Sequence, residues 1–194
     1  WSVASIDLNS DGVSELVVGA VGDNSYTGAV YVLFLSTSGA AVTVQKISNS
    51  DGGLAAHYTL DSGDGFGGSV APLGDVNGDG VPDFAVGASY DWDGNIRVGA
   101  FYFIFATTSG TVGDAAKVSM LEGGFASFYT LGAQDVFGSS LALVGNSDGT
   151  LELVVGAYYD DDGGGAAWYE EDDDGGTNAG AVYALSFEMM SPTP

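Results

Sequence analysis

The chain alternates short apolar segments with polar turns along most of its length. The apolar segments are four to eight residues long, rich in Val, Phe and Tyr, and bounded by Gly, Asp, Asn and Ser. This pattern is typical of β-strands rather than helices. We therefore predict an all-β fold with antiparallel strands at 2–6, 15–20, 28–35, 42–48, 68–73, 83–88, 99–105, 115–120, 139–144, 152–157 and 180–187.

The predicted strands belong to a unit that occurs three times. In each copy an acidic turn precedes an apolar strand that ends in Gly-Ala, at 19–20, 87–88 and 156–157. A second Gly-Ala then opens an aromatic-rich strand, at 28–35, 99–105 and 180–187. Because the landmarks recur in the same order, the period indicates stacked blades or a solenoid.

The repeat divides the chain into three units and a tail. We place the units at 1–65, 66–136 and 137–190, and a linker-like tail at 191–194. The first unit begins inside the pattern, at Trp1, so we expect the chain to be a piece of a longer protein. The third unit shows no clear fourth strand and carries an acidic insertion at 158–179.

Charge and composition exclude several classes of partner and chemistry. The chain has 26 Asp and Glu against 3 Lys and Arg, a net charge of −23, which disfavours nucleic acid and anionic lipid. It has no cysteine, so disulfides, thiolate zinc sites and cysteine nucleophiles are excluded. Its apolar runs are far shorter than the roughly 20 residues of a membrane span, so we expect no membrane insertion.

Two of the acidic turns have the spacing of a calcium-binding loop. Oxygen-bearing side chains stand at loop positions 1, 3, 5 and 9, and a backbone carbonyl is available at position 7. A glycine at position 6, Gly12 or Gly80, permits the sharp turn that brings position 9 back to the ion. The predicted Ca²⁺ ligands are Asp7, Asn9, Asp11, Val13 and Glu15 in the first loop, and Asp75, Asn77, Asp79, Val81 and Asp83 in the second.

These loops differ from an EF-hand, which closes with Glu at position 12 and is flanked by helices. Here the last ligand leads directly into a predicted strand. The third copy is shorter and retains only weaker candidate ligands, Asn146, Asp148 and Glu152. The alternative is that Asp, Asn and Gly simply end strands in turns, but two loops that match at four positions favour a cation site.

The units resemble FG-GAP repeats, the blades of the integrin α-subunit β-propeller. The resemblance is carried by Phe66-Gly67, Phe137-Gly138, the two acidic loops and the three Gly-Ala endings. It implies three tandem four-stranded antiparallel blades of β-propeller type, with calcium loops on one rim, in an extracellular or cell-surface protein for adhesion or scaffolding. Closed propellers use 4–8 blades, so three blades predict a segment of a larger propeller or an open, assembled array.

Other functions have weaker support. His57 is the only histidine, so a Ser/His/Asp site cannot be built, and we expect no enzyme and regard His57 as a packing or surface residue. One alternative is a self-assembling fibre or surface-layer subunit, in which copies of the chain are the partners. Another is a glycan-binding part of a carbohydrate-active enzyme, suggested by aromatic residues in the acidic insertion, Tyr158, Tyr159, Trp168 and Tyr169.

Overall fold

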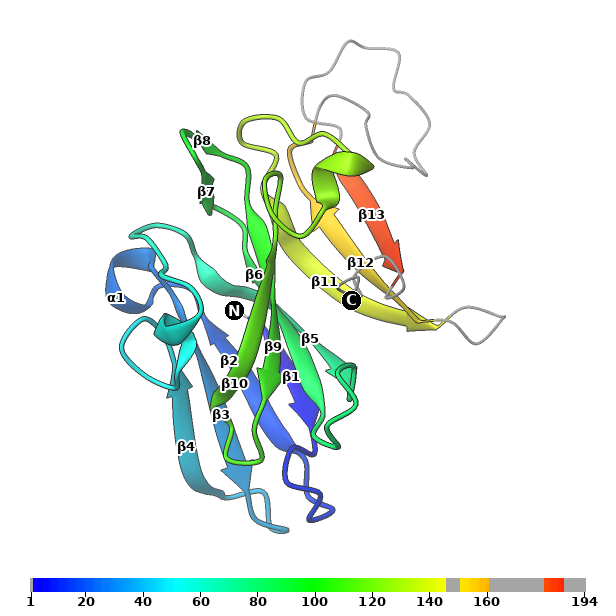
Figure 1. The fold of residues 1–194 in the computed structure, drawn as a ribbon. Helices are drawn as coiled ribbons and strands as arrows, with labels where there is room; N and C mark the ends of the chain where they lie inside the picture. The colour runs from blue at the N-terminus through cyan, green and yellow to red at the C-terminus, as the bar shows by residue number, and fades with distance from the viewer. Residues whose placement is uncertain (1, 146–150, 161–179, 187–194) are drawn as a thin grey trace.

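The strands predicted from the sequence are present in a computed structural model that describes residues 2–145, 151–160 and 180–186 (Figure 1). Strands make up most of the regular structure, with one helical turn and two 3₁₀ turns. In chain order the elements are β1 (Val3–Ile6), β2 (Glu15–Ala20), α1 (Asp23–Tyr26), β3 (Ala29–Leu35), β4 (Ala41–Ile47), η1 (Leu54–Ala56), β5 (Phe66–Gly74), β6 (Asp83–Ala88), β7 (Trp92–Asp93), β8 (Ile96–Arg97), β9 (Ala100–Ala106), β10 (Val112–Val118), η2 (Phe125–Ser127), β11 (Phe137–Gly145), β12 (Leu151–Ala157) and β13 (Ala181–Ser186).

The strands form three antiparallel sheets, which we call blades 1, 2 and 3. Blade 1 has the order β1-β2-β3-β4, blade 2 the order β5-β6-β9-β10, and blade 3 the order β11-β12-β13. The strands β7 and β8 form a separate two-stranded hairpin. The structure therefore confirms the fold class, a partial propeller of tandem antiparallel blades, with three strands in the described part of the third.

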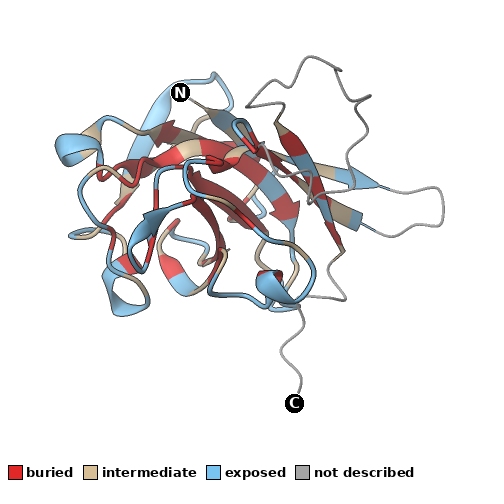
Figure 2. Cartoon of the chain, turned by 90° about the horizontal axis from the view of Figure 1, so that it is seen from above, coloured by how far each residue is buried: buried red, intermediate tan, exposed pale blue. Residues whose placement is uncertain are grey.

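The blades pack face to face through two hydrophobic clusters. One cluster joins blade 1 to blade 2 and includes Val17, Val32 and Tyr102, and the other joins blade 2 to blade 3. Blade 2 is covered on both faces, so every residue of β6 is buried, whereas β4 of blade 1 is mostly exposed. In Figure 2 the buried segments lie within the molecule and exposed loops surround them. Burial on both faces explains why β6 and β9 have nearly continuous apolar sequences rather than alternating ones.

The Phe-Gly pairs lie at the junctions between blades. Phe66 and Phe137 are fully buried, and each forms a parallel bridge with a glycine of the preceding blade, Gly28 and Gly99. The glycine of the Gly-Ala ending is required for the same packing. A Cβ on Gly19 would lie 1.9 Å from the carbonyl oxygen of Gly67, so the two backbones meet only because neither residue has a side chain there.

Several element boundaries differ from the sequence prediction. The strand predicted at 115–120 occupies Val112–Val118 instead, because the turn after β9 is short and Val112 already pairs with Ala106. The strand predicted at 68–73 begins at Phe66, where the bridge to Gly28 starts the pairing. The hairpin β7–β8 was not predicted, since each of its strands has only two residues.

Candidate metal loops and a buried lysine cluster

The first acidic loop connects β1 to β2 and is held by its own side chains. The Asp7 carboxylate accepts hydrogen bonds from the backbone N–H groups of Asp11 (3.2 Å) and Gly12 (3.1 Å). Asn9 Oδ1 accepts from the Asp11 N–H, and Asp11 Oδ1 accepts from the Val13 N–H. The side chains at positions 1, 3 and 5 therefore turn toward the inside of the loop.

The second loop, between β5 and β6, repeats this arrangement. Asp75 accepts from the N–H groups of Gly78, Asp79 and Gly80, at 2.7 to 3.1 Å. Asn77 Oδ1 accepts from the Asp79 N–H, and Asp79 Oδ1 from the Val81 N–H. Both loops lie at the same end of the blades, the lower end in Figure 1. The structure thus gives the two loops one local conformation, as their matching sequences predict.

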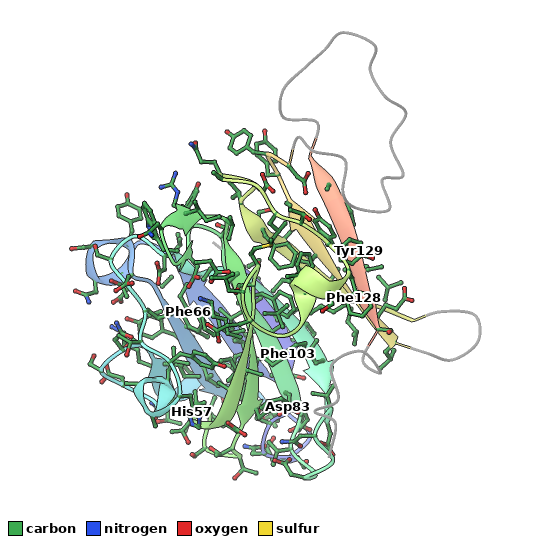
Figure 3. All side chains as sticks on the ribbon, turned by 45° about the horizontal axis from the view of Figure 1, so that its top comes forward. His57, Phe66, Asp83, Phe103, Phe128 and Tyr129 are labelled. Carbon is green, nitrogen blue, oxygen red and sulfur yellow. The ribbon has the colours of Figure 1, made fainter. Side chains whose placement is uncertain are left out.

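The acids at position 9 are buried, unlike those earlier in each loop. Glu15 and Asp83 are both 0% exposed and begin β2 and β6. Both Asp83 oxygens accept backbone hydrogen bonds, from Val76 and Ala106 at 3.1 Å. Figure 3 shows Asp83 at the loop end of blade 2, away from Phe66 in the interior. Burial raises the pKa of Asp83, although these hydrogen bonds oppose the shift.

Glu15 has one carboxylate oxygen without a partner. Its Oε2 accepts from the Leu8 N–H at 2.7 Å, whereas its Oε1 is buried and has no hydrogen-bond partner. Burial raises the pKa of Glu15, and the nearby charges of Asp11 and Asp7 raise it further. A buried polar atom left unsatisfied is costly, so the folded chain gives Glu15 Oε1 no contact that offsets its burial.

Among residues 2–145, 151–160 and 180–186, which include both acidic loops, no group of three or more Asp, Glu, His or Cys side chains is close enough together to hold a metal ion. In the third copy, Asn146 and Asp148 lie outside the described residues, while Glu152 is half-buried in β12, opposite Val144. Most of the acidic insertion also lies outside, so its predicted roles stay predictions.

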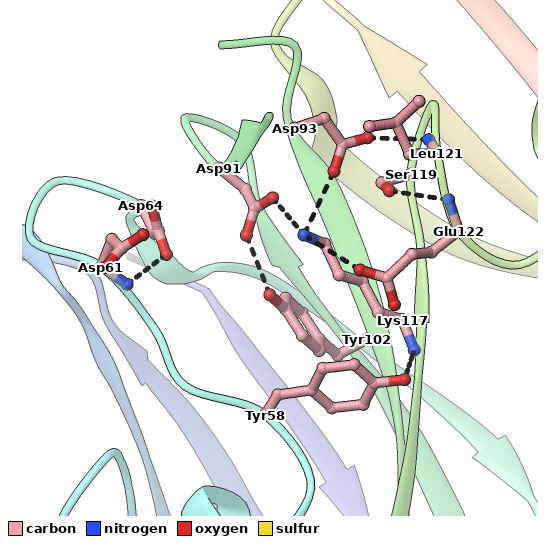
Figure 4. Close-up of polar contacts among 10 residues, drawn as sticks. All are labelled: Tyr58, Asp61, Asp64, Asp91, Asp93, Tyr102, Lys117, Ser119, Leu121 and Glu122. Atoms are coloured by element: carbon pink, nitrogen blue, oxygen red, sulfur yellow. Dashed lines mark hydrogen bonds and ion pairs between the residues drawn. The ribbon is translucent and has the colours of Figure 1, made fainter. Parts of the chain in front are cut away.

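The structure reveals a buried cluster around Lys117 that the sequence analysis missed. Lys117 Nζ lies 2.6 Å from Asp91 Oδ1, 3.3 Å from Asp93 Oδ1 and 3.8 Å from Glu122 Oε1 (Figure 4). Tyr102 donates its hydroxyl to Asp91 Oδ2 at 2.8 Å. Burial disfavours the lysine charge, but the hydrogen bond and charge of Asp91 outweigh it, so the net shift of the Lys117 pKa is upward.

A smaller, more exposed arrangement of the same kind occurs in blade 1. Lys46 Nζ lies 2.8 Å from Asp23 Oδ1, and Tyr31 donates its hydroxyl to Asp23 Oδ2. In blade 3, Tyr183 donates to Asp160 in the equivalent way. The signal was available in the sequence, because the two lysines of the chain are 71 residues apart, as are Tyr31 and Tyr102.

Asp64 provides a pH-dependent contribution to stability. It is 2% exposed, its Oδ2 accepts from the Asp61 N–H, and its Oδ1 has no hydrogen-bond partner. Burial raises the pKa of Asp64 to about 6, and the charge of Asp91 adds to the shift. Since the folded state then binds a proton more tightly than the unfolded state, this contribution is present at low pH and is lost as pH rises from about 4 to about 6.

We expect Asp64→Asn to stabilise the protein at pH 7.5 by about 1–2 kcal/mol, because it removes a buried charge and can keep the bond to Asp61. The gain should disappear below pH 4, where Asp64 is already protonated. Urea unfolding of both proteins between pH 3.5 and 8 measures the effect. An unchanged difference across this range would contradict the assignment to Asp64, and Asp61→Asn, an exposed acid nearby, serves as the control.

Comparison with known proteins identifies the repeat that the sequence and the blades show. The family model described as "FG-GAP repeat" matches residues 1–33 and 66–98. Integrin alpha-7 of Homo sapiens is 38% identical over 130 residues, 63% of this chain and 9% of that protein. Phosphatidylinositol-glycan-specific phospholipase D of Bos taurus is 31% identical over 166 residues, 81% of this chain and 18% of that protein.

The fold, the Phe-Gly junctions and these matches place the chain in the FG-GAP repeat family. The chain spans less than a fifth of the length of the relatives it matches. In the part of the chain that the structure describes, no helix has the length and apolar character needed to cross a membrane.

Proposed function

We propose that the chain is a calcium-stabilised, non-catalytic module of an extracellular protein, used for adhesion or for binding another protein. The observation that carries the calcium proposal is the buried, unpartnered Oε1 of Glu15 beside the loop that holds Asp7 and Asp11. The donor set is made of carboxylates, an amide and a carbonyl, all oxygen ligands of the kind that Ca²⁺ prefers. The location and role are supported by the similarity to integrin α-subunits.

Calcium would be held by the side chains at positions 1, 3, 5 and 9, with the carbonyl of Val13 or Val81. The bound ion would supply positive charge to each corner between two strands and offset the repulsion among its carboxylates. Backbone N–H groups hold the carboxylates of Asp7 and Asp75 toward the inside of their loops, which supports this proposal. Calcium is therefore expected to stabilise the blades rather than to take part in a reaction.

We expect Ca²⁺ to stabilise the folded chain by about 2.7 kcal/mol per site at a concentration 100-fold above the Kd of that site. Calorimetric titration should report two sites, and Asp11→Asn or Asp79→Asn should each remove or weaken one. The control Asp61→Asn changes the same charge outside the loops and should leave both sites intact. Because the net charge is −23, any added salt could stabilise the chain by screening its repulsion. The stabilisation by Ca²⁺ must therefore be compared with the stabilisation by Na⁺ at the same ionic strength. Equal stabilisation by Na⁺, or none at millimolar Ca²⁺, would refute the proposal.

Glu15→Gln gives a second test of the first loop. Without calcium, the variant should be no less stable than the parent protein at pH 7, because it removes a buried carboxylate whose Oε1 is unpartnered. With calcium it should gain less stability than the parent, since a carboxylate ligand is lost. Denaturant unfolding with and without calcium measures both differences. A variant stabilised by calcium as strongly as the parent would remove Glu15 from the ligand set.

The enzymatic alternative rests on relatives from Bos taurus and Homo sapiens whose name includes phospholipase D. The chain covers 18% of each of these proteins, so their activity is not carried over to it. The glycan-binding alternative stays a prediction of the sequence, because Trp168 and Tyr169 lie outside the described residues. The fibre alternative stays a prediction as well.

A further inference from the structure

Blade 3 ends in a strand whose counterparts in blades 1 and 2 are covered by a further strand. In those two blades the third strand, β3 or β9, pairs with the second strand on one side and with the fourth, β4 or β10, on the other. Within the described residues, the third strand of blade 3, β13, pairs with β12 alone. Backbone groups at such an edge point away from the sheet, where another strand can pair with them.

In blade 2 the fourth strand is also held from outside, by the connection that leaves blade 1. The Val112 N–H, at the start of β10, donates to the Gly52 carbonyl oxygen at 2.8 Å. Further along β10, the Lys117 N–H donates to the Tyr58 hydroxyl at 3.1 Å. The strand β10 therefore lies in a groove whose two walls are β9 and the connection 48–58.

The connection that leaves blade 2 builds the same wall beside β13. Three residues of the first connection have counterparts 71 residues later: Gly52, His57 and Tyr58 correspond to Gly123, Phe128 and Tyr129. The Tyr129 ring packs edge-on against Tyr183 of β13, with ring centres 5.0 Å apart, as Tyr58 packs against Tyr102 of β9. Figure 3 shows Phe128 and Tyr129 close to β13. Both walls of the groove are therefore present in blade 3.

A shallow apolar hollow lies where the fourth strand would begin. Its lining includes Val118, Phe125, Phe128 and Leu185. A Cβ on Gly53 would lie 3.1 Å from the Val112 oxygen, whereas a Cβ on Gly124, the counterpart of Gly53, would meet no atom of the described residues within 4 Å. The Phe128 side chain is 60% exposed. The hollow therefore corresponds to the place that Val112 fills in blade 2.

The fourth strands of blades 1 and 2 share a lysine, and this lysine defines the chemistry of the strand. Lys46 of β4 and Lys117 of β10 each stand opposite a tyrosine of the third strand. Each lysine reaches the aspartate that accepts the hydroxyl of that tyrosine. In blade 3, Tyr183 of β13 donates to Asp160 in the same way. A strand added to β13 in the same register would place a lysine opposite Tyr183.

This chain has no further lysine for such a strand. Its three basic residues are Lys46, Lys117 and Arg97, which belong to β4, β10 and β8. A second copy has the same limit, because its two lysines are paired with aspartates of its own blades. Two copies that each carry a net charge of −23 also repel one another. These facts favour a different protein as the source of the strand.

We propose that the groove between β13 and the connection 119–129 binds an extended segment of a partner protein by β-strand addition, with a lysine opposite Tyr183 and a small apolar residue in the hollow. Backbone hydrogen bonds to β13 would provide affinity, and the two side chains would provide specificity. The residue beside Phe128 would be uncharged, because Phe128 replaces His57, which lies 3.2 Å from Asp114 in blade 2. This inference rests on the protein-binding part of the proposed function and does not involve calcium.

The probe is a synthetic peptide with blocked ends and the sequence of residues 111–119, in which Asp114→Thr introduces the residue that β4 has at this place, Thr43. It is titrated into the ¹⁵N-labelled chain at 0.15 M NaCl, with and without Ca²⁺, and followed by NMR and amide hydrogen exchange. We expect saturable binding, with slower exchange at alternate residues of β13. The edge strand β4 of blade 1 should not change, and a scrambled peptide of the same composition should not bind.

Two substitutions test the contacts. Lys117→Gln in the peptide should weaken binding about tenfold, as expected for loss of one charge-assisted hydrogen bond. Phe128→Asp in the chain should weaken it about fivefold through lost apolar contact, although the added charge attracts the cationic peptide. The matched control Leu121→Asp introduces the same charge at a side chain that is 69% exposed and outside the hollow, and should bind like the parent.

Several results would overturn the proposal. Equal binding of the scrambled peptide would mean that charge alone attracts it, and protection confined to β4 would place it on the wrong edge. Slow exchange in β13 without peptide would show that the chain covers this edge itself or with a second copy, which sedimentation at several concentrations distinguishes. Absence of binding at millimolar peptide would also refute it, while stabilisation by Ca²⁺ in the same samples would leave the calcium part of the proposed function standing.

Discussion

Replacing Gly28 by alanine is expected to destabilise the chain by about 3–5 kcal/mol, from left-handed backbone strain and steric overlap together. Gly28 has a φ of 92°, and a Cβ there would lie 2.0 Å from the carbonyl oxygen of Phe66. That oxygen belongs to the backbone of the next blade and cannot rotate away. The substitution should therefore loosen the junction between blades 1 and 2.

Gly39→Ala separates the cost of left-handed backbone strain from the cost of steric overlap. Gly39 has a φ of 80°, but a Cβ added there would have no atom within 4 Å, so the substitution should cost only the strain, about 1 kcal/mol. Gly99→Ala, whose Cβ would lie 2.3 Å from the Phe137 oxygen, should behave like Gly28→Ala. Urea unfolding of the three variants measures the difference. If Gly28→Ala cost no more than Gly39→Ala, the blades could not meet as described.

Replacing Lys117 by methionine is expected to cost about 3–5 kcal/mol at pH 7, because it leaves buried carboxylates without their cation. Asp91 and Asp93 are 3% and 5% exposed, and water cannot take over the role of the lysine. The pKa of Asp91 is already raised by burial, and the Lys117 charge opposes that shift. Without the lysine the pKa should rise further, so the loss of stability should become smaller as pH falls.

Lys46→Met is the matched control for Lys117→Met. Its ion pair with Asp23 is partly exposed, with 29% and 20% of the two side chains accessible. Solvent screens such a pair, and its removal should cost about 0–1 kcal/mol. Thermal and urea unfolding between pH 4 and 8 compare the two variants. Equal losses, or a loss for Lys117→Met that does not change with pH, would show that the buried carboxylates are not the cause.

Much of the fold could be predicted because its signals are local and repeated. Strand-length apolar runs, Gly-Ala endings and acidic turns identified the strands β2, β3, β6, β9 and β12 within a residue or two. The two acidic loops were found for the same reason, since spacing along the chain determines which side chains face into a loop. The calcium ligands themselves stay a proposal.

Features that depend on contacts between distant residues were missed. The Lys117 cluster brings together Asp91, Asp93 and Glu122 from two connections and a strand, and Lys117, Asp91 and Asp93 are buried in the folded chain. The hairpin β7–β8 has too few residues for a periodic signal. The hairpin places Asp93 beside Lys117, and this role is visible only in the tertiary structure.

The sequence by itself determined the repeat, the antiparallel strands and the loops that could hold calcium, because each depends on neighbours in the chain. Only the tertiary structure decided that Gly19 and Gly28 face the backbone of the next blade, and that Lys117 is saturated with carboxylates while Lys46 is not. Those outcomes depend on which face of each blade is covered and on the length of the connection 89–98, which contains the hairpin β7–β8. Neither can be read from a pattern of residues within a single repeat.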